Sequence, residues 1–143
     1  MRLFRVWDKK YNAFWIGDDI FITPDGRPGI IDSKNQKLLH EVFIYNPEDY
    51  IIQFFTGNKD KNGKNVFEGD IVQFKFTVGD FTWETMDEES RRQNEELNGQ
   101  EFIAEVRWDN CLCGFHLVVL ERENIFFPAI YINDGVVVGN IFT

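Results

Sequence analysis

The sequence predicts a mainly β protein, a small barrel or sandwich with one helix. Short apolar runs recur with turn signals roughly every 8–12 residues, which is typical of such folds. Aromatic residues make up 16% of the chain, including 15 Phe and 4 Trp, and aromatic side chains favour strands. The exception is an acidic segment over residues 80–101, whose charge spacing indicates a helix.

Length and composition limit the classes of protein to which this chain can belong. With 143 residues, 43% of them hydrophobic, the chain is expected to form a single domain with its own core. Its start, MRLFRVWDKK, lacks the apolar stretch of a signal peptide, and no later run is long enough for a membrane span. Two cysteines without a secretion signal predict a reduced, cytoplasmic setting, and no cofactor is expected.

The formal net charge of −9 argues against nonspecific binding to nucleic acid. Eight acidic residues and two arginines fall between Asp80 and Glu101, so most of the excess charge belongs to one segment. Residues 80–101 sum to −6, so the rest of the chain carries −3 of the total of −9.

The first third of the chain is expected to consist of hairpins. Apolar residues 3–7 and 14–16 predict a first hairpin, and residues 20–22 and 30–31 predict two short strands around the turn sequence TPDGRPG. A further apolar segment, residues 38–44, ends at Asn46-Pro47, and residues 50–55 predict another strand.

The stretch FFTGNKDKNGKNVFEGDIVQF, residues 54–74, specifies turns in unusual detail. Asn62-Gly63 is a strong hairpin signal before a strand at Val66. Gly69 is the expected site of positive φ, and Asp70 is expected to accept hydrogen bonds from turn amides. We therefore interpret the motif as a determinant of the fold, through Thr56, Gly57, Asp60, Asn62, Gly63, Glu68, Gly69 and Asp70.

A helix is predicted over about residues 85–98. Thr85 and Glu88 have capping-box spacing, Arg91 and Arg92 follow acids at i,i+4, and Gly99 stands just past the end. The helix is polar on every face, so it is expected to project or to pack only near its ends. The candidate partner-binding residues here are Trp83, Met86 and Leu97.

Four further strands are expected after the helix. They cover residues 102–108, 115–120, 124–132 with an interruption at Pro128, and 136–138 after the turn Asn133-Asp134-Gly135. Within residues 71–76, alternation places Phe74 and Phe76 on one face, most simply the core, and Lys75 on the other.

The order of these pieces resembles the YopX family of phage and prophage proteins. The resemblance rests on Arg5-Val6-Trp7-Asp8-Lys9, residues 56–72, residues 106–110 with Gly114-Phe115, and residues 138–141. It implies a mainly β fold with an SH3-like barrel, here an N-terminal β part of about residues 1–55 and a barrel of about 56–143 with the helix inserted, all within one unit. It also implies the cytoplasm of a bacterial host and supplies no catalytic residues. The acidic helix is longer than the family's connection and lies outside the resemblance.

Three candidate ligands for a metal lie within six residues: Cys111, Cys113 and His116. Alternation would place both sulfurs on one face, but zinc needs a fourth ligand and His40 is distant in sequence, so packed thiols are the simpler interpretation. The acid pairs Glu68 with Asp70 and Asp18 with Asp19 are more simply turn carboxylates than catalytic groups. The lysine-rich loop 59–64 lacks the spacing of a phosphate-binding loop.

These observations predict a non-enzymatic module for protein–protein interaction or self-assembly, with itself or with a host or phage protein as partner. Two alternatives stay open. One is a nucleic-acid-associated regulator that uses the small barrel, and the other is a metal-binding enzyme that uses Cys111, Cys113 and His116.

Overall fold

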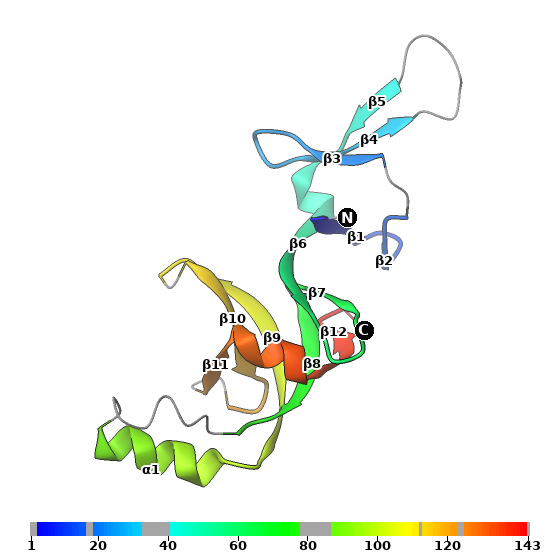
Figure 1. The fold of residues 1–143 in the computed structure, drawn as a ribbon. Helices are drawn as coiled ribbons and strands as arrows, with labels where there is room; N and C mark the ends of the chain where they lie inside the picture. The colour runs from blue at the N-terminus through cyan, green and yellow to red at the C-terminus, as the bar shows by residue number, and fades with distance from the viewer. Residues whose placement is uncertain are drawn as a thin grey trace. The chain divides into compact units, whose positions relative to one another are not determined.

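The computed structural model describes residues 3–16, 19–32, 41–77, 87–111, 113–122 and 125–142 (Figure 1). Over these residues the chain is mainly β, as predicted. By its contacts it divides into two compact units, Met1–Phe55 and Thr56–Thr143. Within the described ranges, no helix is long and apolar enough to cross a membrane.

The first unit contains the predicted N-terminal hairpin. Strand β1 (Phe4–Asp8) pairs antiparallel with β2 (Ala13–Phe14), and Asn12 between them adopts a φ of 49°. On its other side, β1 pairs with the first half of β6 (Tyr50–Lys59). Val6 and Trp7 of β1 are buried, because the apolar centre of the strand lies between its two partners.

A second, three-stranded sheet in this unit has the order β3-β4-β5, with β3 (Ile20–Ile22), β4 (Pro28–Asp32) and β5 (Glu41–Ile44). The predicted TPDGRPG turn joins β3 to β4, and its Gly26 has a φ of +84°. Of the predicted segment 38–44, residues 38–40 lie outside the described residues. A short 3₁₀ helix, η1 (Pro47–Asp49), precedes β6, and the Asn46 side chain caps it.

The second unit is built on a five-stranded antiparallel sheet of order β11-β10-β9-β8-β12, which curls into a half-barrel. The unit begins with the end of β6, which pairs with β7 (Asn65–Phe67). The sheet strands are β8 (Asp70–Lys75), β9 (Glu101–Asp109), β10 (Gly114–Val119), β11 (Phe126–Pro128) and β12 (Val136–Asn140).

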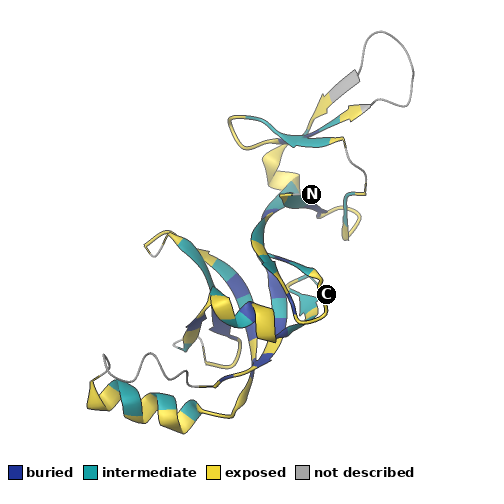
Figure 2. Ribbon diagram, in the orientation of Figure 1, coloured by how far each residue is buried: buried dark blue, intermediate teal, exposed yellow. Residues whose placement is uncertain are grey.

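Alternation along β8 and β9 directs every second side chain into the core (Figure 2). Phe74 and Phe76 are 2% and 5% exposed, as the alternation of residues 71–76 predicted, whereas Lys75 is exposed. The Phe74 ring lies edge-on to the Phe127 ring, with centroids 5.2 Å apart. The rings of Phe74 and Phe76 are therefore packed in the core and are not exposed for stacking with the bases of a single-stranded nucleic acid.

The prediction of an extended run over residues 124–132 is wrong after Pro128. A 3₁₀ helix, η3 (Ala129–Asp134), follows β11 directly, and the Gly135 amide donates to the Ile132 carbonyl at 3.1 Å. This helix fully buries Ile132 and places the Tyr131 ring 5.8 Å from that of Phe74. The apolar run Ala129–Ile132 does not alternate with polar residues, so periodicity does not distinguish a strand from a helix there.

The predicted acidic helix is α1 (Glu88–Leu97). It starts later than expected, because the Asp87 side chain is the N-cap and accepts a hydrogen bond from the Ser90 amide at 2.7 Å. The predicted capping box is therefore wrong, since Glu88 stands at the first helical position rather than the third, and Thr85 lies outside the described residues. Gly99 follows the C-cap with a φ of +82°, as its position predicted.

Candidate interaction site

Polar side chains of the central motif, residues 54–74, form hydrogen bonds with backbone groups of the protein. Asp60 is 6% exposed, and its Oδ1 accepts hydrogen bonds from the amides of Asn62 and Lys64, each at 2.9 Å. Its Oδ2 accepts from the Val137 amide of β12 at 3.0 Å. Gly63 closes the turn with a φ of +81°. One carboxylate thus shapes the β6–β7 turn and ties it to the edge strand of the half-barrel.

The turn Glu68-Gly69-Asp70, later in the motif, also forms hydrogen bonds with the backbone of other segments. Gly69 adopts a φ of +84°, its amide donates to the Val106 carbonyl at 2.8 Å, and its carbonyl accepts from Ile141 at 2.9 Å. Asp70 is 2% exposed and accepts from the Phe67 amide at 2.9 Å, as expected of a turn carboxylate. Elsewhere in the motif, the Thr56 hydroxyl donates to the Val66 carbonyl at 2.7 Å, and Gly57 has a φ of +85°.

The three candidate metal ligands do not converge. Cys111 and Cys113 lie in the β9–β10 turn with exposed side chains, so the strand alternation assumed for them does not apply. Cys113 has a φ of 51°, and its Sγ contacts the Asn110 carbonyl. His116 lies on β10 with its ring edge-on to Phe126. Over the ranges that the structure describes, no group of three His, Cys, Asp or Glu side chains is placed to hold a metal ion.

Of the three predicted partner-binding residues, Trp83 and Met86 lie outside the described residues. Leu97, in the last turn of α1, is partly buried and packs against the core of the second unit. It therefore anchors the end of the helix, although none of the residues of α1 is fully buried.

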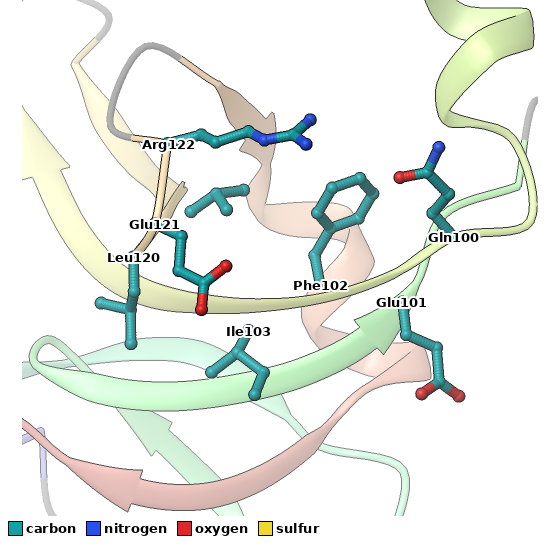
Figure 3. A pocket seen from close by; sticks show the side chains of 8 residues that line it. Gln100, Glu101, Phe102, Ile103, Leu120, Glu121 and Arg122 are labelled. Carbon is teal, nitrogen blue, oxygen red and sulfur yellow. The ribbon is translucent and has the colours of Figure 1, made fainter.

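Two large aliphatic side chains lie exposed at the end of the β9–β10 ladder. Ile103 is 47% exposed and Leu120 is 45% exposed, and the Leu120 amide donates to the Ile103 carbonyl at 3.1 Å. Both side chains point to the same side of the sheet (Figure 3). On the opposite side of β9 lies the Phe102 ring, which is 7% exposed and part of the core.

A pocket of about 300 Å³ lies at this place. Its walls come from the start of β9 and from the end of β10 with the turn that follows. We call it the β9–β10 pocket, and its lining consists of Gln100, Glu101, Phe102, Ile103, Val119, Leu120, Glu121 and Arg122. The lining combines apolar and charged side chains, as binding sites commonly do.

The rim of the pocket is predominantly acidic. Glu101 and Glu121 are exposed, and the lining has one cation, Arg122. The Glu101 carboxylate accepts a hydrogen bond from the Gln73 side chain of β8 at 3.4 Å. The C-terminal end of α1 lies beside Gln100 (Figure 3), and the Gln100 side chain donates to the Glu96 carbonyl at 2.6 Å. The exposed Glu95 and Glu96 in this last turn extend the negative charge from the rim onto the helix.

Sequence reasoning did not find this pocket. Within the predicted strand 102–108, the buried residues Phe102, Ala104 and Val106 alternate, so Ile103 falls on the outer face, where a polar residue is usual. That outward apolar residue was a signal in the sequence. Its neighbour Leu120 is 17 positions away, and only the register of β9 against β10 brings the two together.

Comparisons with known proteins relate the chain to one family and to two solved structures. The family model described as YopX protein matches residues 3–143. The crystal structure of protein EF1440 from Enterococcus faecalis is similar, with a TM-score of 0.51 and 20% identity over 98% of this chain and 92% of that one. The crystal structure of protein yopX from Bacillus subtilis has a TM-score of 0.55 and 14% identity over the same shares of the two chains.

At these identities the two structures show the fold alone. No curated protein matches the sequence significantly. The family match, in contrast, covers nearly every residue, including all the segments on which the resemblance was based. The chain therefore belongs to the YopX family.

Proposed function

We propose that this protein is a non-enzymatic module for protein–protein association, and that the β9–β10 pocket is where a partner docks. The observation that carries the proposal is the pair of half-exposed aliphatic side chains, Ile103 and Leu120, adjacent to a pocket at the end of a rigid ladder. Single exposed apolar residues are common on protein surfaces, but adjacent ones beside a concavity with a polar rim are characteristic of interaction sites.

The energy available supports association of moderate strength. Burying apolar surface contributes about 25 cal/mol per Å², so covering the exposed parts of two aliphatic side chains contributes roughly 1–3 kcal/mol. A complete interface needs more surface than this pocket alone. We therefore regard Ile103 and Leu120 as the centre of a larger contact, with the polar groups of the rim around it.

The same proposal includes the finer points implied by the family resemblance. We place the protein in the cytoplasm of a bacterium that carries a phage or prophage, and we assign the half-barrel to the SH3-like type. The partner is either a second copy of this chain or a protein of the host or the phage. The small sheet β3-β4-β5 supports a further contact, since Phe43 and Ile44 on its edge strand β5 are 43% and 49% exposed.

The test compares two matched variants with the wild type. Leu120→Gln alters the proposed site, and Ile141→Gln alters a side chain of similar exposure, 48%, outside the pocket lining. Each protein is used as bait in bacterial lysate, and its own oligomeric state is measured by sedimentation. We expect Leu120→Gln to lose a retained protein or an oligomer that Ile141→Gln keeps.

Three results would contradict the proposal: a wild-type monomer that retains no protein, partners that both variants retain equally, or partners that both variants lose equally. The melting temperatures of the two variants provide the control for folding, because both changes are at exposed positions and are expected to leave stability nearly unchanged.

A further inference from the structure

We infer that the occupant of the β9–β10 pocket is a segment of a partner protein in which apolar side chains stand next to lysine or arginine. This inference rests on the proposed function and names the chemistry of the partner.

The pocket suits side chains of a peptide rather than a large ligand. Ile103 and Leu120 offer adjacent exposed aliphatic surface on the outer face of the β9–β10 ladder, whereas the Phe102 ring lies on the opposite side of β9 (Figure 3). A volume of about 300 Å³ is at the lower end for ligand sites, which begin at about 300 Å³. One or two apolar side chains of a peptide therefore fill it.

The charge around the pocket calls for a cation. Glu101 and Glu121 stand on the rim, and Glu95 and Glu96 occupy the last turn of α1, which has no basic residue. The C-terminal end of a helix carries a partial negative charge, so cations are stabilising there and glutamates are not. The two glutamates of the lining outnumber its one arginine, so a basic segment of a partner would complement the excess negative charge.

Arg122 limits how basic this segment is. Its guanidinium is the one cation of the pocket lining, and Figure 3 shows it on the same side of β9 as Phe102 and Gln100. Five N–H donors suit it to carbonyl oxygens of a peptide backbone. A long run of cations would be repelled by it, whereas one or two basic residues that face the glutamates avoid it. Nucleic acid is disfavoured as the occupant, because the glutamates of the lining repel phosphate.

Three labelled peptides test the inference by fluorescence polarisation with the full chain. The first has a Leu-Phe pair between flanking Lys-Arg pairs, the second replaces the basic residues by Glu, and the third replaces Leu-Phe by Ser-Ser. We expect the first to bind at least about tenfold more tightly than either control, and its affinity to fall as salt rises.

Variants of the protein locate the binding. Leu120→Gln is expected to weaken the first peptide about fivefold or more, as truncation of a central contact does. Glu121→Gln is expected to weaken it about twofold and to reduce the salt dependence. Glu48→Gln is the charge-matched control, because Glu48 is exposed in η1 of the other unit, and it is expected to change nothing.

Equal affinity for the three peptides, or an unchanged affinity in Leu120→Gln, would overturn the inference. So would an oligomer of the wild type that Leu120→Gln dissociates while the first peptide does not bind, since the occupant would then be a second copy. In that case the proposed association function still holds. A partner from lysate that depends on Leu120, together with failure of the basic peptide, likewise refutes only the chemistry assigned to the partner.

Discussion

Asp60 offers the sharpest test of how the family motif holds the half-barrel together. Its carboxylate accepts three backbone hydrogen bonds, two within the β6–β7 turn and one from Val137 on β12. The residue is buried, so an alanine at this position leaves three amides without their acceptor. Lys61 adds a second bond to the same neighbour segment, from its amide to the Gly135 carbonyl at 2.8 Å.

The expected loss in Asp60→Ala is large. A hydrogen bond to a charged group contributes about 1.5–3 kcal/mol, and because three such bonds share one carboxylate we expect a combined loss of roughly 3–5 kcal/mol in the free energy of unfolding. Asp60→Asn is the graded control. Its amide oxygen is able to keep the two bonds within the turn, but its NH₂ group then faces the Val137 amide, so we expect about half the loss.

Urea unfolding followed by circular dichroism measures both variants against the wild type. A loss smaller than about 1 kcal/mol in Asp60→Ala would show that water replaces the carboxylate without penalty, and would refute the role assigned to it. Equal losses in the alanine and asparagine variants would show that the charge, rather than the number of accepted bonds, is what matters.

The same carboxylate predicts a dependence on pH. Burial opposes ionisation of Asp60, but hydrogen bonds from Val137, Lys64 and Asn62 outweigh it and lower its pKa from the ordinary value of 3.8. The stabilisation is therefore complete above pH of about 4 and disappears as the pH falls through the lowered pKa. We expect the stability difference between wild type and Asp60→Asn to be constant at neutral pH and to shrink only below about pH 4. A difference that shrinks between pH 5 and 7 contradicts this reasoning.

Three further substitutions test other elements. Gly69→Val forces a β-branched side chain into a φ of +84° and is expected to cost about 1–3 kcal/mol, with a smaller loss in Gly69→Asn; an unchanged melting temperature in the valine variant shows that the motif was misinterpreted. Gly135→Ala places a Cβ 2.6 Å from the Val72 Cγ1 and is expected to destabilise the half-barrel by about 1–3 kcal/mol, measured by urea unfolding; full stability would mean that this contact relaxes freely. Asp87→Ala removes the N-cap of α1 and is expected to lower the helical signal in circular dichroism, whereas Asp87→Asn retains it; equal spectra for the two variants contradict the cap.

The strands were predictable wherever turn residues and alternation agreed. The β1–β2 hairpin, the β3–β4 turn and the faces of β8 followed from local sequence, because each signal spans only a few residues. Two local errors arose where signals competed. The segment after Pro128 is apolar without alternation, and it forms η3 rather than a strand. The N-cap of α1 is Asp87, whereas the predicted capping box had placed it at Thr85.

The candidate site was beyond sequence reasoning for a different reason. A pocket depends on which strands are neighbours and on their register, and neither is encoded within a short window. Ile103 looked like one more apolar residue of a strand, and Leu120 like the last residue of the next. Only the pairing of β9 with β10 and the end of their ladder show that both face solvent together.

The family motif stabilises the fold through hydrogen bonds to backbone amides, whereas the proposed site offers exposed side chains for recognition. In the motif, Asp60 and Asp70 bind amides, and Gly63 and Gly69 supply positive φ, so the polar groups of these buried acids already serve the fold. A residue committed in this way cannot exchange its partner for a ligand without a loss of stability. Recognition therefore falls to side chains that the fold exposes and does not use, and the exposed aliphatic and acidic side chains of the β9–β10 pocket fit that description.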